Sequence, residues 1–271
     1  ILLATQPTDV EAAARAHAGR LAPTGRMVCC QNGLCEARVA EVLGDASRVV
    51  GAVISWGAHM PEPGVVDKTS SAGGFTLGRL DGADEPGLDA LAEGLGAIGP
   101  VKRTRNLAGV RWSKLALNCV VSSLGTLNGT PLGPVIRQGT ARRLALRIMG
   151  EAVAVAQAEG VALEKVAGTL DLPWMVRPAA APGRALRHGV LAAAGLKYRR
   201  MRSSMLRAIE AGRPPAVDHL NGEVVRYGAR HGAATPANAA VTRAVWALSR
   251  GEAAAGPAII SKVWREVHRG G

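Results

Sequence analysis

Three polar side chains form a stripe across an apolar segment in the middle of the chain. Residues 112–125 read WSKLALNCVVSSLG. At 3.6 residues per turn, Lys114, Asn118 and Ser122 lie one above the other on one face of a helix. A lysine partly removed from water becomes a usable proton donor, and the neighbouring amide and hydroxyl can hold a carboxylate or hydroxyl group. The alternative is a surface lysine whose alkyl chain lies along an amphipathic helix.

A second candidate lies in a turn between a strand-like run and a helical pattern. Residues 29–34 read CCQNGL, with Asn32 and Gly33 directly after the predicted strand. Parallel α/β sheets bind ligands at the carboxyl ends of their strands, which would place Asn32 beside a ligand. The alternative is an ordinary Asn-Gly turn in which Gly33 adopts a positive φ. The residues alone leave both interpretations open.

Two adjacent serines begin a third region, residues 203–238. The pattern predicts two helices joined by a Gly-Arg-Pro-Pro turn, with Ser203 and Ser204 as N-caps. A serine hydroxyl at a helix start also binds anionic groups, because free backbone amides and the helix dipole lie beside it. Both a structural and a binding role therefore fit these serines.

The predicted elements that position these residues change in character from about residue 108. Apolar runs and helical patterns alternate before that point, which predicts an α/β fold with a parallel sheet. The predicted strands cover 1–5, 27–30, 48–58, 61–66 and 75–80, and the predicted helices 9–22, 36–44 and 85–99. The later chain predicts helices at 112–125, 141–160, 203–212, 217–232 and from 236, with a Pro-rich joint at 171–184. We therefore expect a sheet domain followed by an all-helical domain.

Composition excludes several classes of protein. The chain has 271 residues, of which 48% are hydrophobic, enough for a full core, and apolar runs are too short to span a bilayer. We expect a cytoplasmic protein without a membrane partner. The net charge of +12 admits a nucleic-acid partner, but the arginines are dispersed and aromatic residues make up 3%. The charge equally suits an anionic substrate and a phosphorylated cofactor, so we expect no nucleic acid.

The cysteines and a glycine-rich run are weaker signals. Four cysteines without CxxC spacing indicate small buried residues rather than disulfides or a metal site. Glycines 94, 96 and 99 match a dinucleotide-binding spacing, but the run closes a predicted helix, whereas a phosphate loop must open one. The chain begins with Ile1 inside a strand. We therefore expect that it lacks its natural N-terminus and that the phosphate loop precedes Ile1.

Taken together, QNGL, the WSKLALN helix, SSML with VDHLNG, and HGAATPAN resemble the ketopantoate reductases (2-dehydropantoate 2-reductases) in order and separation along essentially the whole chain. The resemblance implies NADPH-dependent reduction of a small 2-oxo acid, ketopantoate or a related acid. It implies an incomplete Rossmann-type NADP-binding domain over residues 1–105 and a helical substrate and dimerisation domain over 106–271. It leaves the oligomeric state open between a monomer and a homodimer.

The resemblance also implies roles for individual residues. Lys114 matches the family's catalytic lysine, which donates a proton to the substrate carbonyl. Asn118 and Ser204 match substrate-binding residues, and Ser122 stands where a second helix asparagine is common. Asn32 matches the asparagine that touches both nicotinamide and substrate. The remaining cofactor-binding candidates are Gly57, where the backbone meets the nicotinamide ribose, and Gln6, where a lysine often stands.

One departure from the family pattern concerns a charged residue. Where the family usually has Glu before Ile-Asp, this chain reads Pro215-Ala216-Val217-Asp218, so Ala216 replaces a carboxylate that helps to position cofactor and substrate. Asp218 and Glu210 are the acidic residues near it in sequence. A charged partner used in the transition state contributes several kcal/mol, on the order of 3. A family member that binds ligand with weak or no catalysis is therefore the alternative function.

Overall fold

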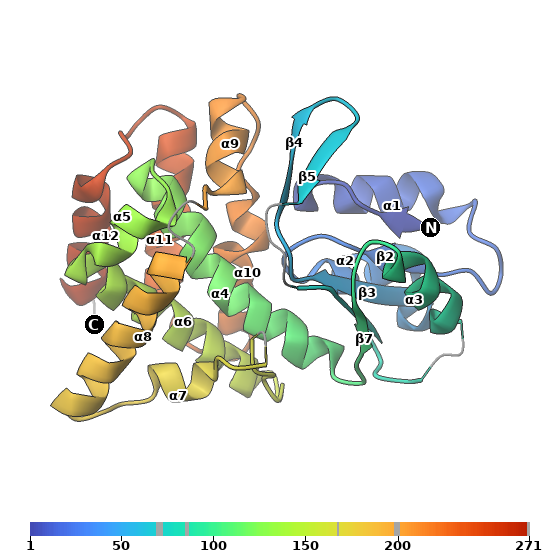
Figure 1. The fold of residues 1–271 in the computed structure, drawn as a ribbon, viewed down its shortest axis with the longest axis horizontal. Coiled ribbons are helices and arrows are strands. Elements are labelled where there is room, and N and C mark those ends of the chain that lie inside the picture. The colour runs from blue at the N-terminus through green and yellow to red at the C-terminus, as the bar shows by residue number, and fades with distance from the viewer. Residues whose placement is uncertain (69–72, 85–86, 167, 198–200, 270–271) are drawn as a thin grey trace. The chain divides into compact units, whose positions relative to one another are not determined.

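The computed structural model describes residues 1–68, 73–84, 87–166, 168–197 and 201–269. Its contacts divide the chain into two compact units. The α/β unit comprises Ile1–Arg111 and Glu164–Leu170, and the helical unit comprises Trp112–Leu163 and Asp171–Gly271. The chain is thus an α/β protein with a Rossmann-type sheet followed by a helical part, as the sequence predicts (Figure 1).

The main sheet of the α/β unit has the order β1-β2-β3-β6-β7. Its strands are β1 (Leu2–Leu3), β2 (Met27–Cys29), β3 (Val49–Ile54), β6 (Phe75–Arg79) and β7 (Val101–Arg103). Strands β1, β2 and β3 are mutually parallel, and β7 is parallel to β6. The sheet is mostly parallel, as the sequence predicts, and the exception is β6, which runs antiparallel to β3. Parallel neighbours need a crossover connection, whereas the described residues between β3 and β6 form a hairpin.

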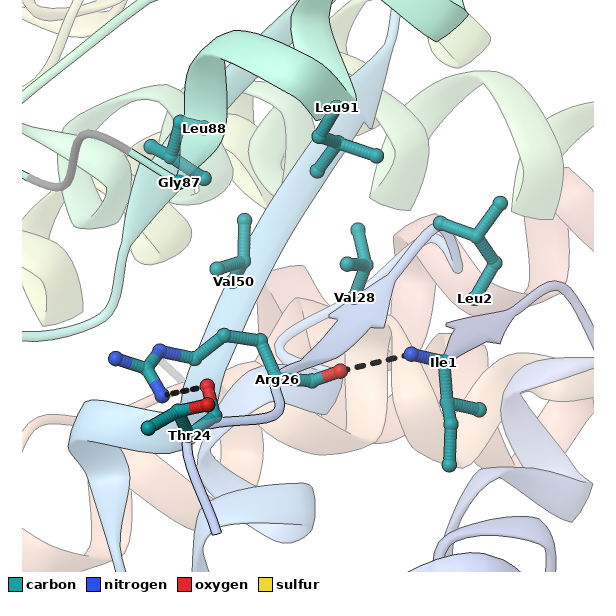
Figure 2. Close-up of a pocket in the computed structure, with 9 residues that line it drawn as sticks. All are labelled: Ile1, Leu2, Thr24, Arg26, Val28, Val50, Gly87, Leu88 and Leu91. Carbon is teal, nitrogen blue, oxygen red and sulfur yellow. Dashed lines mark hydrogen bonds between the residues drawn. The ribbon is translucent and has the colours of Figure 1, made fainter. Parts of the chain in front are cut away.

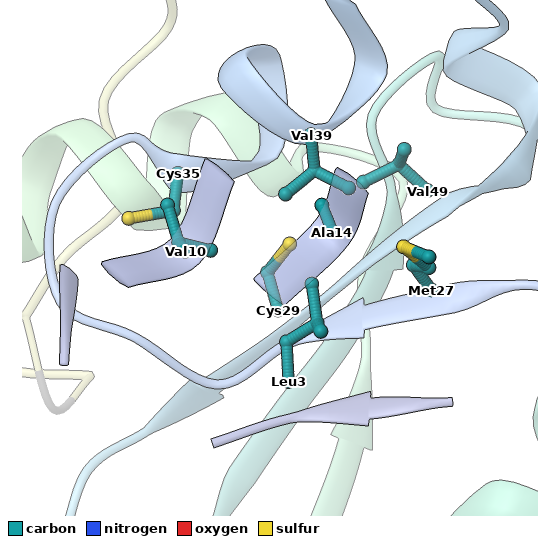
Figure 3. Packing of buried hydrophobic residues seen from close by; sticks show 8 residues of the cluster. All are labelled: Leu3, Val10, Ala14, Met27, Cys29, Cys35, Val39 and Val49. Carbon is teal, nitrogen blue, oxygen red and sulfur yellow. The ribbon is translucent and has the colours of Figure 1, made fainter. Parts of the chain in front are cut away.

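Helices cover both faces of the parallel strands. Successive side chains along a strand point to opposite faces, so each strand packs against helices on both sides. Met27 and Cys29 of β2 point to the face covered by α1 (Val10–Ala18) and α2 (Cys35–Leu43). Figure 3 shows these side chains packed with those of both helices. Val28, between them, packs on the other face with side chains of α3 (Leu88–Gly96). Burial on both faces explains why β2 reads as a continuous apolar run.

The region between β3 and β6 departs most from the predicted strands. The strand predicted at 48–58 ends at Ile54, and the one predicted at 61–66 straddles the turn of a hairpin. The hairpin strands are β4 (Ala58–Glu62) and β5 (Val65–Lys68). Gly64 in that turn has φ +85°, a left-handed conformation that glycine adopts without steric cost. Strand β7 has no counterpart in the predicted pattern, because its three residues, Val-Lys-Arg, neither alternate nor form an apolar run, and the two charged side chains are exposed.

The helical unit is built on α4, which begins in the α/β unit, and on the helices that follow it. They are α4 (Leu107–Asn128), α5 (Leu132–Arg137), α6 (Gly139–Ala158), α7 (Leu172–Val176), α8 (Ala181–Lys197), α9 (Ser204–Glu210), α10 (Asn221–Arg230), α11 (Pro236–Ser249) and α12 (Pro257–Arg269). The Pro-rich joint predicted at 171–184 thus contains α7 and the start of α8. The helix predicted at 217–232 is interrupted at Leu220, whose φ of −118° and ψ of −94° separate a 3-10 turn, Ala216–His219, from α10.

Within the described part of the chain, no helix is both long enough and apolar enough to cross a membrane.

Candidate functional site

Helix α4 has one half-open face, and the predicted polar stripe lies on it. Leu115, Cys119 and Leu124 are 1% exposed or less. The half-buried positions between Lys114 and Ser122 are Lys114, Leu117, Asn118, Val121 and Ser122. At about 100° per residue these positions fall within a sector of about 140°. Lys114, Asn118 and Ser122 therefore share the accessible side of a mostly buried helix, next to the apolar Leu117 and Val121.

A buried amide fixes the opposite side of α4. The side chain of Asn221, fully buried at the start of α10, accepts a hydrogen bond from Ser123 Oγ at 2.5 Å. Its Nδ2 donates to the carbonyl of Cys119 at 3.3 Å and to Asn238 Oδ1 at 2.9 Å. Buried polar groups are stable only when paired, so these bonds tie α4, α10 and α11 together.

The same network ends on a buried carboxylate. Glu151 of α6, 5% exposed, accepts hydrogen bonds from the backbone N–H groups of Ala237 and Asn238, each at 2.9 Å. Asn238 Nδ2 donates to Glu151 Oε2 at 2.8 Å. The first amides of a helix lack intrahelical partners and favour negative charge, so Glu151 caps α11. The sequence analysis missed this group, although Glu151 stands out as a single acid inside the apolar run IMGEAVAVA.

The two adjacent serines have different environments. Ser203 is buried, and its Oγ accepts a hydrogen bond from Leu206 N at 3.4 Å, as an N-cap does. That hydroxyl also lies 2.9 Å from Thr126 Oγ1, and Thr126 in turn donates to the carbonyl of Ser122 at 2.8 Å. Ser204, the first residue of α9, is exposed. The structure therefore brings the start of α9 against α4, one turn beyond Ser122.

The two carboxylates nearest to Ala216 in sequence have other partners. Ala216 is half-buried at the start of its 3-10 turn. Asp218 accepts hydrogen bonds from the indole N–H of Trp246 at 3.0 and 3.2 Å. Glu210 pairs with Arg202 at 2.9 Å. Neither acid is therefore poised to replace the carboxylate that the family pattern has at position 216.

In the α/β unit, the candidate cofactor residues follow the carboxyl ends of the parallel strands. Gln6 follows β1, Asn32 follows β2, and Gly57 lies beyond β3, and these three residues are exposed. Gly33 has φ +93°, the positive value predicted for the Asn-Gly turn. Arg111 donates to the backbone carbonyl of Gln31 at 2.7 Å and so fixes the residue before Asn32.

A buried side-chain oxygen without a hydrogen-bond partner lies at this edge of the sheet. Gln31 is 4% exposed, and its Nε2 donates to Thr5 Oγ1 at 3.2 Å. Its Oε1 has no hydrogen-bond partner among the described residues. A buried acceptor without a donor is costly, and a carboxamide or ribose hydroxyl would supply one. The glycines of the dinucleotide-like run do not extend this site, because Gly94 and Gly96 lie in the last turn of α3 rather than at a helix start.

A hollow of about 340 Å³ lies at the other edge of the sheet. Figure 2 shows it between the amino ends of β1, β2 and β3 and the first turn of α3. It is lined by Ile1, Leu2, Thr24, Arg26, Val28, Val50, Gly87, Leu88 and Leu91. Arg26 donates to the carbonyl of Thr24 at 2.7 Å, and its own carbonyl accepts from the amino group of Ile1 at 2.8 Å. The lining is mostly apolar and lies away from the strand ends that carry Gln6 and Asn32.

Two of the four cysteines, Cys29 and Cys119, are poor nucleophiles. Cys29, Cys35 and Cys119 are buried and Cys30 is half-buried, and the four, all in described segments, form no disulfide. Burial raises the pKa of the Cys29 thiol, and the nearby Glu36 carboxylate raises it further. Burial likewise raises the pKa of Cys119. Because a thiolate is the reactive form, Cys29 and Cys119 are inert at neutral pH.

Fold and site together define a class: proteins in which a Rossmann-type sheet with polar residues at its carboxyl edge is followed by a helical domain. Residues 1–82 match the family "Ketopantoate reductase PanE/ApbA", and residues 106–249 match "Ketopantoate reductase PanE/ApbA C terminal". The chain belongs to the ketopantoate reductase family.

Individual relatives agree with this assignment. The 2-dehydropantoate 2-reductase of Caulobacter vibrioides is 29% identical over 253 residues, which cover 89% of this chain and 74% of that protein. The PanE/ApbA family ketopantoate reductase of Ralstonia eutropha JMP134 superimposes with a TM-score of 0.73 at 26% identity, over 93% of this chain and 76% of that one. D-Mandelate dehydrogenase, solved with NADH and anilino(oxo)acetate, shares the fold with a TM-score of 0.75 at 21% identity, over 93% and 76% of the two chains.

The matches to other family members are shorter. Alignments with three further curated 2-dehydropantoate 2-reductases cover 44%, 54% and 45% of those proteins. The chain therefore spans about half the length of these relatives.

Proposed function

We propose that this protein catalyses the NADPH-dependent reduction of a small 2-oxo acid, ketopantoate or a related branched acid, with Lys114 as proton donor. The observation that carries the proposal is the half-open face of α4, on which Lys114, Asn118 and Ser122 are side by side in a helix that is otherwise mostly buried. Membership of the ketopantoate reductase family supports the same reaction.

The reaction assigns a separate task to each group on α4. The cofactor supplies a hydride to carbon 2 of the substrate. Lys114 donates a proton from Nζ to the carbonyl oxygen as the new C–H bond forms, so that the product is a 2-hydroxy acid and the lysine is left neutral. Asn118 and Ser122 donate hydrogen bonds to the substrate carboxylate, and Ser204 adds a hydroxyl. A positioned general acid contributes about 10²- to 10⁴-fold to the rate.

The cofactor would be held at the carboxyl edge of the parallel strands. Asn32 would contact the nicotinamide and the substrate, and Gln6 and the Gly57 backbone would contact the nicotinamide end. Gln31 Oε1 would accept a hydrogen bond from an N–H or O–H group of the cofactor. The net charge of +12 suits a phosphorylated cofactor such as NADPH, because a positive potential attracts phosphate groups. A protein with this activity would supply pantoate to pantothenate biosynthesis in the cytoplasm, as a monomer or a homodimer.

The test is steady-state oxidation of NADPH with ketopantoate, pyruvate and an aromatic 2-oxo acid as substrates, followed by identification of the 2-hydroxy product. Lys114→Met keeps the length of the side chain and removes the acid, so we expect kcat to fall by about 10²- to 10⁴-fold. Lys262→Met on α12 is the matched control, because Lys262 is exposed and lies outside the stripe. Full turnover by Lys114→Met at saturating substrate would exclude Lys114 as the proton donor.

A second candidate function is ligand binding with weak or no catalysis. It is favoured by Ala216, which lacks the carboxylate. The two acids near it in sequence already have partners: Asp218 accepts a hydrogen bond from Trp246, and Glu210 forms an ion pair with Arg202. This alternative predicts that the wild-type protein binds NADPH and a 2-oxo acid in calorimetry, while cofactor oxidation stays at background for each 2-oxo acid tested. Measurable turnover of ketopantoate by the wild-type protein eliminates it.

A further inference from the structure

A buried guanidinium group lies directly under the turn that carries Asn32. The side chains of Arg111 and Glu36 are each 3% exposed and form an ion pair. Arg111 Nε donates to Glu36 Oε1 at 2.7 Å. Its Nη1 donates to the carbonyl of Gln31 at 2.7 Å, and its Nη2 to the carbonyl of Cys29 at 2.8 Å. One planar group thus reaches one carboxylate and two backbone carbonyls.

The neighbouring strand leaves room for this pair. A Cβ added to Gly51 of β3 would lie 2.7 Å from Glu36 Oε1 and 2.7 Å from a methyl group of Leu107. Such a contact is far shorter than van der Waals distance, so a larger residue at position 51 would displace the carboxylate. The ion pair therefore lies inside the α/β unit between α2, β3 and the first turn of α4, in space that the missing side chain of Gly51 leaves open.

The hydrogen bonds of Arg111 fix the backbone at the point where strand β2 ends. Cys29 is the last residue of β2, and the carbonyls beyond a strand end need donors from elsewhere. Arg111 supplies donors at Cys29 and at Gln31, the residue before Asn32. Asn32 itself is exposed, so its position depends on the backbone that carries it. Charge-assisted bonds from a planar guanidinium fix geometry more tightly than neutral ones.

We propose that Arg111, held by Glu36, is a positioning residue for Asn32: it fixes the backbone of residues 29–31 so that Asn32 meets the nicotinamide cofactor. This inference rests on the proposed function, since it assigns to Asn32 the cofactor contact given there. Arg111 acts through the backbone and does not itself touch the reacting atoms.

The opposite end of β2 provides a matched control. Arg48 also donates to backbone carbonyls, those of Leu21 at 3.4 Å, Ala22 at 2.6 Å and Gly25 at 3.3 Å. These carbonyls precede β2, whereas those bound by Arg111 belong to its end and the turn after it. Arg48→Met therefore removes a comparable set of bonds from the segment that leads into β2 without affecting the Asn32 turn.

The informative variant removes both charges. Arg111→Met alone would leave Glu36 buried without its cation, and such a protein risks unfolding. The double variant Glu36→Leu/Arg111→Met replaces the pair with apolar side chains of similar volume, an exchange that often leaves stability nearly unchanged. Thermal unfolding, hydrogen exchange of the peptide covering 27–34 without ligand, and the NADPH dissociation constant are measured for wild type, double variant and Arg48→Met.

We expect the double variant to keep an unfolding midpoint close to that of wild type. Its amides at residues 30–33 should exchange about tenfold faster, and NADPH should bind about tenfold more weakly, because charge-assisted bonds are lost at one turn. Arg48→Met should leave both of these quantities unchanged. A double variant that binds NADPH as tightly as wild type overturns the positioning role alone. A wild-type protein that binds no nicotinamide cofactor overturns the proposed function and this role with it.

Discussion

The two units of this protein hold their candidate functional residues by different means. In the α/β unit, Asn32 lies on a turn, and a buried ion pair holds the turn's carbonyls from below. In the helical unit, Lys114 and Asn118 lie on a helix whose own backbone hydrogen bonds fix their spacing. Asn221 and the groups around it act between helices, through neutral amides and a hydroxyl, and through Asn238 they reach the Glu151 carboxylate.

The difference follows from backbone chemistry. A turn leaves carbonyl groups without regular partners, so its shape depends on donors supplied by distant side chains. A helix satisfies its interior carbonyls internally, so side chains need only keep it in contact with its neighbours. Loss of Arg111 should therefore alter the conformation of the Asn32 turn alone. Loss of an interhelical amide should lower the stability of the whole helical unit.

The largest effect on stability should come from Asn238→Leu, which keeps the side-chain size and removes the amide. Asn221 Nδ2 and Glu151 would each lose a buried partner, so we expect the free energy of unfolding to fall by about 3 kcal/mol. Urea denaturation measures it. Thr242→Val is the control, since the Thr242 hydroxyl donates to the Asn238 carbonyl from a half-buried position; it should cost about 1 kcal/mol. Equal losses for both variants would show that the network does not hold the helices together.

A smaller effect is expected when a carboxylate is introduced at position 216. Ala216 is half-buried, so Ala216→Glu should leave stability within about 0.5 kcal/mol and raise kcat/KM for ketopantoate about tenfold, or about 1.4 kcal/mol. Ala211→Glu, at an exposed position that ends α9, controls for added charge. An increase for Ala216→Glu would show that the substrate-binding side chains of the helical unit are already positioned correctly and that only the carboxylate at position 216 is missing. An unchanged kcat/KM would show that residue 216 plays no part in the reaction.

The smallest expected effects distinguish the structural role of Ser203 from the binding role of Ser204. Ser203→Ala removes the N-cap of α9 and the contact with Thr126, and should lower the free energy of unfolding by about 1 kcal/mol. Ser204→Ala should change stability by less than about 0.5 kcal/mol, because Ser204 is exposed, and should instead raise KM for the 2-oxo acid. Chemical denaturation and steady-state kinetics measure the two quantities. If Ser204→Ala is the more destabilising variant, the division between scaffold and binding residue is wrong.

Local patterns were sufficient to predict several of the helices and the shared face of Lys114, Asn118 and Ser122. Periodicity identified α1, α2 and α4, and Asn32-Gly33 correctly predicted a positive φ at Gly33. The antiparallel pairing of β6 escaped prediction, because strand direction depends on how a distant connection folds. The roles in binding and catalysis given to Lys114 and its neighbours stay predictions.

The groups that hold the site were not visible in the sequence for the same reason. Arg111 and Gln31 are 80 positions apart, and Asn221 and Cys119 are 102 apart. A lone arginine or asparagine in a helical pattern gives no sign of which distant carbonyl it will meet. Sequence patterns thus locate residues on an element's face, while the partners of buried polar groups require the folded chain.

The most direct test of the central claim is chemical rescue of Lys114→Ala. If Lys114 Nζ donates the proton, the variant should lose about 10²-fold or more in kcat with NADPH and ketopantoate. Added methylammonium should restore turnover in proportion to its concentration, whereas tetramethylammonium, which has the same charge but no N–H, should not. Full turnover of Lys114→Ala, or equal rescue by both cations, would contradict the assignment of Lys114 as the proton donor.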